Sequence, residues 1–399
     1  MNYYTTATGF RQCRTEKTMT TIYLIRHGEA EGNIYRRAQG QHEGRITAKG
    51  LRQVDALAER LRDIHFDALY SSDLKRTIRT AKAVTMYHDV LLQTEPRLRE
   101  LDMGPWEDIP FGNLMYEYPE QMRAFNDDPD RWYVEGAETF VQLKTRIRGI
   151  LTELGEKHDG QTIACCTHGM AIRSFLSDVL DIPSDEIYRI RHGDNTAVSL
   201  VAYENGQFRV LYCNDASHLP PELSTFARQN WWQKKGAWDN DNVRFQRLDP
   251  EKYPSVYLEF YEKTWKAVHG DLDGYHGRLY LDSAVRHVRA NPDALVTIVR
   301  QSGETVGVVE LDTERGAAEG YGWLCLCFIE EAYRRTQLGA QLLGHAVSVF
   351  RNLGRRSIRL SVFDGNAGAI AFYREYGFEV IGETEGVSSR LLIMEKELK

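Results

Sequence analysis

Residues 21–29 read TIYLIRHGE, a short apolar run that ends abruptly at Arg26 and His27. A run of this kind, bounded by polar and turn residues, predicts a buried strand that leads into a loop. A second run at 162–166, TIACC, ends in the same way just before His168. In mainly parallel sheets, ligands gather at the carboxyl ends of the strands. We therefore expect Arg26, His27 and His168 to share one site.

Outward from these two runs, strands alternate with amphipathic helices, which predicts a mostly parallel sheet covered on both faces. Thr47 is expected to cap one helix, and Ser72 or Asp73 to cap the helix that carries Arg76. The first of these helices is expected to bury a stripe made of Leu51, Val54, Ala58 and Leu61. Further strands are expected at Phe66–Tyr70, Thr196–Tyr203 and Phe208–Cys213.

The order of these motifs resembles that of the histidine phosphatase (phosphoglycerate-mutase-like) superfamily, across residues 20–219. The signature LIRHGE at Leu24–Glu29 opens the match, and Cys166–Gly169 resembles the segment that carries the second histidine. Between them, Ser71–Thr80 resembles the segment with the second active-site arginine, and Arg97–Glu100 resembles the segment with the acidic proton donor. The resemblance implies a three-layer αβα domain.

The residues that this resemblance singles out suit phosphoryl chemistry, which needs a nucleophile and positive charge around the phosphoryl oxygens. Neutral His27 can attack phosphorus and form a phosphohistidine. Arg26 and Arg76 can clamp the oxygens, and His168 adds a donor. Glu100 can protonate the leaving alkoxide and then activate water. Because these groups supply the charge that a metal would supply, no metal is expected. The substrate-binding residues that the resemblance implies are Asn33, Arg37, Gln39 and Gly40.

Departures from related families narrow the interpretation. His168 is followed by Gly rather than by the Asp of the acid phosphatases, so Glu100 must provide the acid. The segments Leu101–Glu107 and 136–139 resemble the small phosphatases. The alternative is a phosphoglycerate-type mutase, which needs a pocket that retains its intermediate, and the sequence does not reveal such a pocket.

The tripeptide Arg-His-Gly occurs a second time, at 191–193. This copy precedes an apolar run instead of following one, and no arginine and acid segments follow it. We expect it to form a loop, and the change His192→Ala to leave activity nearly normal.

Residues 243–399 resemble the GNAT N-acetyltransferase superfamily. A predicted strand at Trp323–Ile329 leads into residues 330–343, where the family has a pyrophosphate-binding loop and a helix whose first N–H groups hold the anion. The resemblance implies a mixed α/β domain, acetyl-CoA as cofactor, and Tyr373 as the acid for the departing thiolate. The cofactor-binding residues that it implies are Phe328, Ile329, Arg334, Gln337, Leu338, Gly339, Ala340 and Asn366.

Gln337 stands where the family usually has the first loop glycine, so its backbone must adopt a conformation that favours glycine. The following helix is expected to bury Leu342, Ala346, Val349 and Leu353. Glu310 and Glu330 are candidates for a general base, and the amine acceptor is not readable. A second alternative, of another class, is that this half is a non-catalytic acyl-CoA sensor that regulates the phosphatase.

With 399 residues, the chain is long enough for two domains. The expected division is a disordered extension at 1–18, a phosphatase domain at 19–219, a partly packed linker at 220–241 and an acetyltransferase-like domain at 242–399. Because each set of motifs closes within its own half, we expect the halves to fold independently. A fragment ending near Gln229 should then hydrolyse phosphate esters as the full chain does. The sequence does not decide whether Met1 or Met19 is the real start of the protein.

The net charge of −7 gives no sign of a nucleic-acid partner. The six cysteines lack zinc-ligand spacing, so reduced thiols are expected. No stretch has the composition of a signal peptide or the length of a membrane span. We therefore expect a cytoplasmic, two-domain enzyme: a phosphomonoesterase for a small phosphorylated substrate, fused to an acetyltransferase. The physiological substrates and the oligomeric state are not readable.

Overall fold

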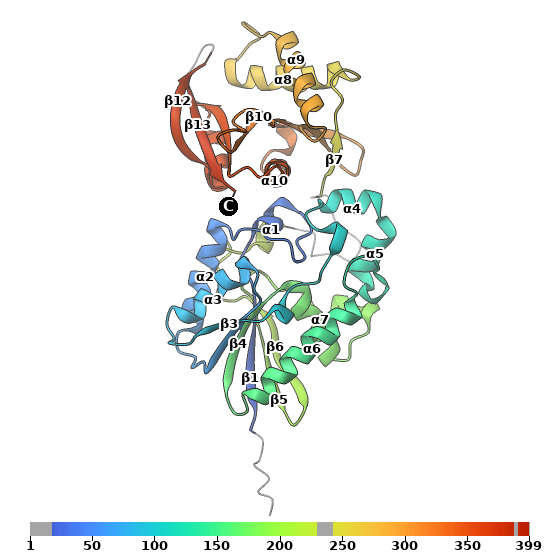
Figure 1. The fold of residues 1–399 in the computed structure, drawn as a ribbon, viewed down its shortest axis with the longest axis vertical. Helices are drawn as coiled ribbons and strands as arrows, with labels where there is room; N and C mark the ends of the chain where they lie inside the picture. The colour runs from blue at the N-terminus through green and yellow to red at the C-terminus, as the bar shows by residue number, and fades with distance from the viewer. Residues whose placement is uncertain (1–17, 230–241, 387–389, 399) are drawn as a thin grey trace, which may run out of the picture.

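Two mixed sheets organise the computed structural model, which describes residues 18–229, 242–386 and 390–398 (Figure 1). The first sheet has the order β3-β2-β4-β1-β5-β6. The pairs among its first four strands are parallel, and the pairs β1–β5 and β5–β6 are antiparallel. Its strands are β1 (Thr20–Arg26), β2 (Ala68–Ser71), β3 (Leu92–Thr94), β4 (Thr162–Thr167), β5 (Val198–Glu204) and β6 (Gln207–Asp215).

Helices cover both faces of the first sheet, as expected for a three-layer αβα domain. On one face lie α2 (Ala48–Leu61) and α3 (Lys75–Thr85), and on the other lie α6 (Phe140–Lys157) and α7 (Gly169–Val179). The parallel strands end on the side that faces the second lobe (Figure 1). Three short helices lie beyond those ends: α1 (Glu31–Tyr35), α4 (Phe111–Glu117) and α5 (Pro119–Asp127).

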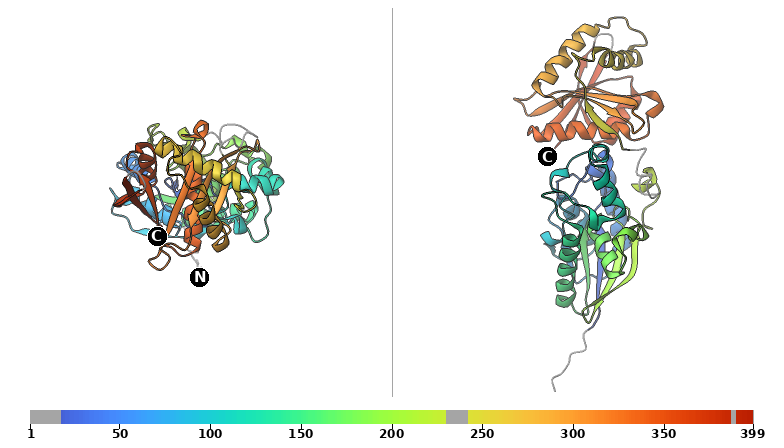
Figure 2. Two further views of the ribbon diagram at one scale, coloured as in Figure 1. Left: turned by 90° about the horizontal axis from the view of Figure 1, so that it is seen from above. Right: turned by 90° about the vertical axis from the view of Figure 1, so that its right-hand side faces the viewer.

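The second sheet has the order β12-β13-β11-β10-β9-β8-β7, with β10 and β11 parallel and the other pairs antiparallel. Helices lie on both sides of it (Figure 2). Its strands are β7 (Arg244–Arg247), β8 (Leu295–Val299), β9 (Thr305–Asp312), β10 (Tyr321–Ile329), β11 (Ser357–Phe363), β12 (Glu379–Glu385) and β13 (Arg390–Glu397). Its helices are α8 (Pro254–His269) and α9 (Gly277–Ala290) on one face, and α10 (Leu338–Asn352) and α11 (Ala367–Glu375) on the other.

Short 3₁₀ helices connect some of these elements. They are η1 (Pro96–Leu98), η2 (Gly104–Trp106), η3 (Pro129–Arg131), η4 (Ser184–Arg189), η5 (Phe226–Arg228) and η6 (Glu331–Tyr333).

The two helix-covered sheets confirm the expected mixed α/β architecture of both halves.

Three local predictions are wrong. Leu51 is 45% exposed, because the stripe of α2 that packs on the sheet is centred on Leu57 and Leu61, and Leu51 lies at its edge. Leu353 is 39% exposed, because α10 ends one residue before it. The N-cap of α3 is Leu74, which has no capping side chain. Thr47 does cap α2, by accepting from the N–H of Gly50.

Some expectations fall outside the described residues. These are the disordered extension, except for its last residue, and the packing of the linker over residues 230–241. The division into independent domains also stays a prediction. Of the helices in the described parts of the chain, none combines the length and the apolar character that a membrane crossing requires.

Candidate active site

His27 lies directly after β1, at the carboxyl end of the sheet, and only 3% of it is exposed. Its Nδ1 lies 2.8 Å from the carbonyl oxygen of Gly28. A carbonyl only accepts hydrogen bonds, so Nδ1 carries the proton and Nε2 keeps its lone pair. Burial, followed by the charges of Arg76 and Arg26, holds the pKa of His27 well below its ordinary value. The ring is therefore neutral at neutral pH, with Nε2 as the free nucleophilic atom.

Two guanidinium groups bring positive charge to the same place. Arg76, in the first turn of α3, is 1% exposed and donates to the carbonyls of His42, at 2.9 Å, and Gly40, at 2.6 Å. Arg26 donates to the carbonyl of Gly193. Within the described residues, the Nε of each arginine is buried without a partner. Burial lowers the pKa of Arg76 to about 10, so both groups stay charged at neutral pH. Unpaired buried donors beside two cations suit an anionic group.

His168 is the N-cap residue of α7 and is fully buried. Its ring centroid lies 5.3 Å from that of His27, and its Nε2 lies 2.7 Å from the Oγ of Ser72. Burial, together with the charge of Arg76, holds the pKa of His168 well below its ordinary value. Its Nδ1 is buried and has no partner among the described residues. The geometry therefore brings together the strand-end residues that the sequence predicted.

Glu100 reaches this site from the loop after η1. Its Oε1 accepts from the N–H groups of Leu101, at 3.0 Å, and Ala171, at 2.9 Å, while Oε2 accepts from Met170 at 3.0 Å. The last two donors belong to the first turn of α7, where helical N–H groups lack intrahelical partners. The carboxylate is thus held beside the residue that caps the same helix, His168.

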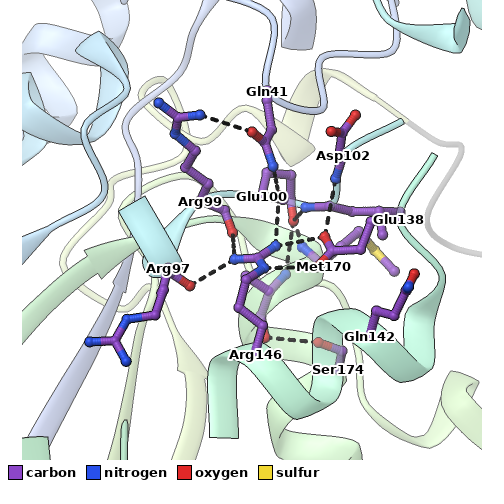
Figure 3. A network of polar contacts seen from close by, with 12 residues as sticks. Gln41, Arg97, Arg99, Glu100, Asp102, Glu138, Gln142, Arg146, Met170 and Ser174 are labelled. Atoms are coloured by element: carbon purple, nitrogen blue, oxygen red, sulfur yellow. Dashed lines mark hydrogen bonds and ion pairs between the residues drawn. The ribbon is translucent and has the colours of Figure 1, made fainter. Parts of the chain in front are cut away.

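Arg146, which the sequence analysis did not single out, positions the segment that carries Glu100 (Figure 3). From α6 it donates to the carbonyls of Arg97, at 2.7 Å, Arg99, at 2.9 Å, and Glu100, at 3.1 Å. Its guanidinium also pairs with Glu138 at 2.7 Å. No sequence signal distinguishes this arginine from the exposed Arg148 of the same helix, because most of its partners are backbone carbonyls.

The four predicted substrate-binding residues all line one cavity with His27, Arg26, Arg76 and Glu100, but their roles differ. Arg37 is turned to other partners: its Nε donates to Asp108 at 2.7 Å, and its Nη2 donates to Ser348 at 3.0 Å. Its Nη1 is buried without a partner among the described residues, so its assignment as a substrate ligand stays a prediction. Gly40 holds Arg76 through its carbonyl, and Asn33 accepts from the N–H of Ala30 at 2.9 Å. The Oε1 of Gln39 is buried and, within the described chain, unpaired.

The second Arg-His-Gly does form a loop, as expected, but this loop belongs to the site. His192 and Gly193 line the cavity, and Gly193 accepts from Arg26. Burial and nearby Arg173 hold the pKa of His192 well below its ordinary value. The expectation that His192→Ala leaves activity nearly normal therefore loses its basis. A loop that follows no strand in sequence reached the site through tertiary packing.

The cavity has a volume of about 150 Å³ and is lined by two kinds of residue. The polar ones include the nucleophile and the arginines. Most of the apolar ones come from residues 101–125, which lead from Glu100 into α5. The sequence pattern of these residues does not separate them from ordinary core residues. They are Leu101, Met103, Phe111, Met115, Met122 and Phe125.

In the second lobe, β10 and β11 pair only as far as Leu324 and Leu360. Beyond this point β10 continues to Ile329, so Phe328 and Ile329 lie where the two strands have parted. A register shift between Leu324 and Leu326 marks the same place. Residues 330–343, the expected cofactor segment, follow directly. A ligand that enters the gap between β10 and β11 would meet the free edge of β10.

Gln337 adopts the left-handed conformation, with φ of 66°, directly before α10. The backbone thus takes the form that the missing glycine would favour. Leu338, Gly339 and Ala340 form the first turn of α10, whose N–H groups can hold an anion. Arg334 is exposed beside them and lies over the ring of Phe328. Asn366 caps α11 through Ala369, at 3.0 Å, so its Oδ1 is already bonded.

Tyr373 belongs to α11 and lies near the thiol of Cys327 on β10. Burial and the nearby thiol raise the pKa of Tyr373 well above its ordinary value, and burial raises the pKa of Cys327 to about 12. Both groups therefore hold their protons at neutral pH. A tyrosine that keeps its proton can act as an acid, as the resemblance implied.

Glu310 is 2% exposed and its two oxygens are already bonded. It accepts from the hydroxyl of Tyr257 at 2.9 Å and pairs with His287 at 2.8 Å, and His287 also contacts Asp312 at 3.3 Å. Burial lowers the pKa of His287, but the bond to Glu310 and both carboxylate charges outweigh it, and the pKa is raised. Glu310 is thus occupied as an ion-pair partner, and Glu330 is bonded to Lys263 at 2.7 Å. Neither is poised to act as a base.

Donor atoms of His287, Glu310 and Cys325 lie within 4.8 Å of one another, a set of types that can bind a metal ion. Both ring nitrogens of His287 already face carboxylates, and a histidine must lose a proton to bind a metal. The arrangement therefore suits a buried ion pair better than a metal centre.

Comparison with known proteins agrees with this geometry. Residues 22–216 match the histidine phosphatase superfamily (branch 1), and residues 257–378 match the acetyltransferase (GNAT) family. Phosphoserine phosphatase 1 of Hydrogenobacter thermophilus is 29% identical over 201 residues, which are 50% of this chain and 95% of that protein. The probable phosphoglycerate mutase GpmB of Proteus mirabilis is 32% identical over 206 residues, with coverage of 50% and 95%. Among solved structures, YhfR of Bacillus stearothermophilus is 28% identical with a TM-score of 0.48, covering 50% of this chain and 98% of that one.

The chain therefore belongs to the histidine phosphatase superfamily and carries a domain of the acetyltransferase (GNAT) family in its second half. The named relatives match about half of the chain.

Proposed function

We propose that the first lobe is a phosphomonoesterase that acts through a phosphohistidine on His27. The observation that carries the proposal is the bond from His27 Nδ1 to Gly28, which leaves Nε2 nucleophilic in a cavity that also holds Arg26, Arg76 and Glu100. The substrate class is a small phosphorylated metabolite, with its phosphoryl group beside His27, Arg26 and Arg76. The similarity to a phosphoserine phosphatase supports a hydrolytic reaction.

The reaction follows in two displacements. In the first, Nε2 of His27 attacks phosphorus, the bond from phosphorus to the ester oxygen breaks, and Glu100 gives its proton to the departing oxygen. In the second, the Glu100 carboxylate takes a proton from water, the water oxygen attacks phosphorus, and the bond to Nε2 breaks. Inorganic phosphate leaves and Glu100 is protonated again. Arg26, Arg76 and His168 stabilise the charge on the transferring group in both steps.

The test is to trap the phosphoenzyme with a ³²P-labelled or mass-tagged substrate. Wild-type protein should carry label on His27, and His27→Ala should carry none and lose turnover while keeping its thermal unfolding temperature. Chelators should not change the rate, because the proposed clamp is made of side chains. Full activity in His27→Ala, or activity abolished by EDTA and restored by a metal, would rule the mechanism out.

The alternative is a phosphoglycerate-type mutase, and the similarity to a probable phosphoglycerate mutase favours keeping it. A mutase must retain its intermediate and depends on a bisphosphorylated primer. Assays with 2- and 3-phosphoglycerate, with and without the bisphosphate, distinguish the two: phosphate release supports the hydrolase, and isomerisation that needs the primer supports the mutase.

For the second lobe we propose acetyl-CoA-dependent N-acetyltransferase activity. The parted strands β10 and β11, the left-handed Gln337 and the first turn of α10 fit the cofactor. When bound there, acetyl-CoA would supply the activated acetyl thioester. The residues that would hold it are Phe328, Ile329, Arg334, Gln337, Leu338, Gly339 and Ala340, and Tyr373 would protonate the thiolate. The amine acceptor is not identified.

The rival for this lobe is a non-catalytic acyl-CoA sensor. Calorimetry with acetyl-CoA, followed by a screen of primary amines for acetyl transfer, separates the two. Binding without turnover on any amine would favour the sensor, and absence of binding would remove both.

We also propose a cytoplasmic location. The free thiols of the described cysteines support it, and cell fractionation is the test.

A further inference from the structure

Helix α10 is buried on all sides. Packing on the second sheet alone would bury only one side of it. Every residue from Ala340 to Phe350 is buried, including the polar residues Gln341, His345 and Ser348. A helix that packs on a single sheet buries one stripe and leaves its other face polar and exposed. The second face of α10 lies against α1 of the phosphatase lobe, where Figure 1 shows the two helices between the lobes.

The contact between α1 and α10 is close and apolar at its centre. A Cβ placed on Gly344 of α10 would lie 2.5 Å from the Cβ of Tyr35 in α1. Tyr35 is 3% exposed and belongs to the hydrophobic core of the second lobe. Glu31, also in α1, pairs with Arg351 at 2.7 Å. The two lobes therefore share a core at this point, and their contact is not limited to the linker.

A hydrogen-bonded triangle joins α10 to the phosphatase segment 36–42. Ser348 donates to the Oδ2 of Asp108 and accepts from Arg37 Nη2, while Arg37 Nε donates to the Oδ1 of Asp108. The backbone N–H of Asp108 donates to Ala38 at 2.8 Å. Ser348 is thus the member from the second lobe that ties together two stretches of the first.

Segment 36–42 carries the carbonyls that hold the phosphate clamp. The two acceptors of Arg76 are Gly40 and His42, which follow Arg37 by three and five residues. At the other end of the segment, Asn242 accepts from Arg36 Nε at 2.9 Å, and both residues line the cavity. The second lobe therefore holds this segment at two points, and the segment in turn holds Arg76.

We propose that Ser348 of α10 is a positioning residue for the phosphatase reaction, so that the acetyltransferase-like lobe completes the phosphatase site. This inference rests on the proposed phosphatase function. It replaces the expectation that a fragment ending near Gln229 is as active as the full chain, because such a fragment lacks Asn242, Gly344 and Ser348. Displacements of about 1 Å in groups that orient catalytic residues are enough to slow an enzyme severely.

The experiment compares two matched serine variants of the full chain with p-nitrophenyl phosphate as the probe. Ser348→Ala removes the hydroxyl of the triangle, and Ser283→Ala removes an exposed hydroxyl from α9 of the same lobe. We expect Ser348→Ala to lower kcat about tenfold with little change in KM, because Arg76 acts most strongly on the transition state. Ser283→Ala should match wild type in both constants.

If Ser348→Ala does not fold, glycine variants decide the question in the same way. Gly344→Ala places a methyl group against Tyr35, whereas Gly149→Ala in α6 meets no heavy atom within 4 Å. Gly344→Ala should lower kcat, and Gly149→Ala should not. If the wild-type protein is inactive, the proposed function fails. If the wild-type protein is active and the kcat of Ser348→Ala equals that of its control, the positioning role is refuted. Where Ser348→Ala does not fold, the same comparison is made with Gly344→Ala.

Discussion

The sharpest test of the proposed chemistry is Glu100→Gln. The carboxylate accepts three N–H groups, two of them in the first turn of α7. An amide keeps one oxygen for Leu101 and Ala171 but turns an NH₂ group toward the N–H of Met170. The NH₂ group and the N–H of Met170 would then both lack an acceptor, and a buried donor without an acceptor lowers the free energy of unfolding by about 1–3 kcal/mol. Because Glu100 is partly exposed, we expect a loss of stability near the lower end of that range.

The catalytic effect should exceed this and depend on the leaving group. General acid catalysis contributes about 10²–10⁴-fold, which corresponds to about 3–5 kcal/mol of barrier. The leaving group of an alkyl phosphate is a strongly basic alkoxide, so its departure needs the proton of Glu100. The p-nitrophenolate ion leaves without protonation, so the first step with p-nitrophenyl phosphate should be almost unchanged.

The assay is single-turnover phosphoenzyme formation with both substrates, with Glu153→Gln as the control. Glu153 is an exposed partner of Arg97 and lies outside the cavity. We expect the phosphorylation rate of Glu100→Gln to fall about 10²-fold or more with the alkyl phosphate only. An equal loss with both substrates would mean that Glu100 has a structural role, and an unchanged rate with the alkyl phosphate would refute its role as acid.

Three further predictions concern pH and the cofactor loop. Since the pKa of His27 is lowered, its neutral form persists on acidification, and the acid limb of kcat/KM that it causes should lie below pH 6.5; a limb above that pH would contradict the assignment. Burial lowers the pKa of His345 to about 4 in the folded chain, so below pH 6.5 the unfolded state binds more protons and stability falls, by up to about 1.4 kcal/mol per pH unit toward pH 4. Urea titrations should show this slope weakened in His345→Gln, and an equal slope would exclude His345 as its source. Gln337→Gly should keep or improve acetyl-CoA binding in calorimetry, because glycine adopts a φ of 66° without the strain of a side chain; weaker binding would mean that the Gln337 side chain itself contributes.

The sequence by itself determined the two folds and the chemistry-bearing residues of the first site. Apolar runs that stop at His27 and His168 identify strand ends, and strand ends of a parallel sheet converge at one edge. Arg26, Arg76 and Glu100 followed from their place in an ordered set of motifs. These features are local, because the period and the length of an apolar run determine which element it forms.

Tertiary structure alone decided what each side chain contacts. Arg37 was expected to bind substrate, and it also bonds to Asp108 and Ser348. His192 was expected to lie outside the site, but it lines the cavity. Arg146 acts on carbonyls that any sequence would present at those positions. The same holds for Ser348 of α10, whose partners Asp108 and Arg37 belong to the other lobe. Such contacts join residues that are far apart in the sequence; Arg37 and Ser348, for example, are separated by 311 positions. A local pattern of polarity carries no information about which distant surface will pack against it.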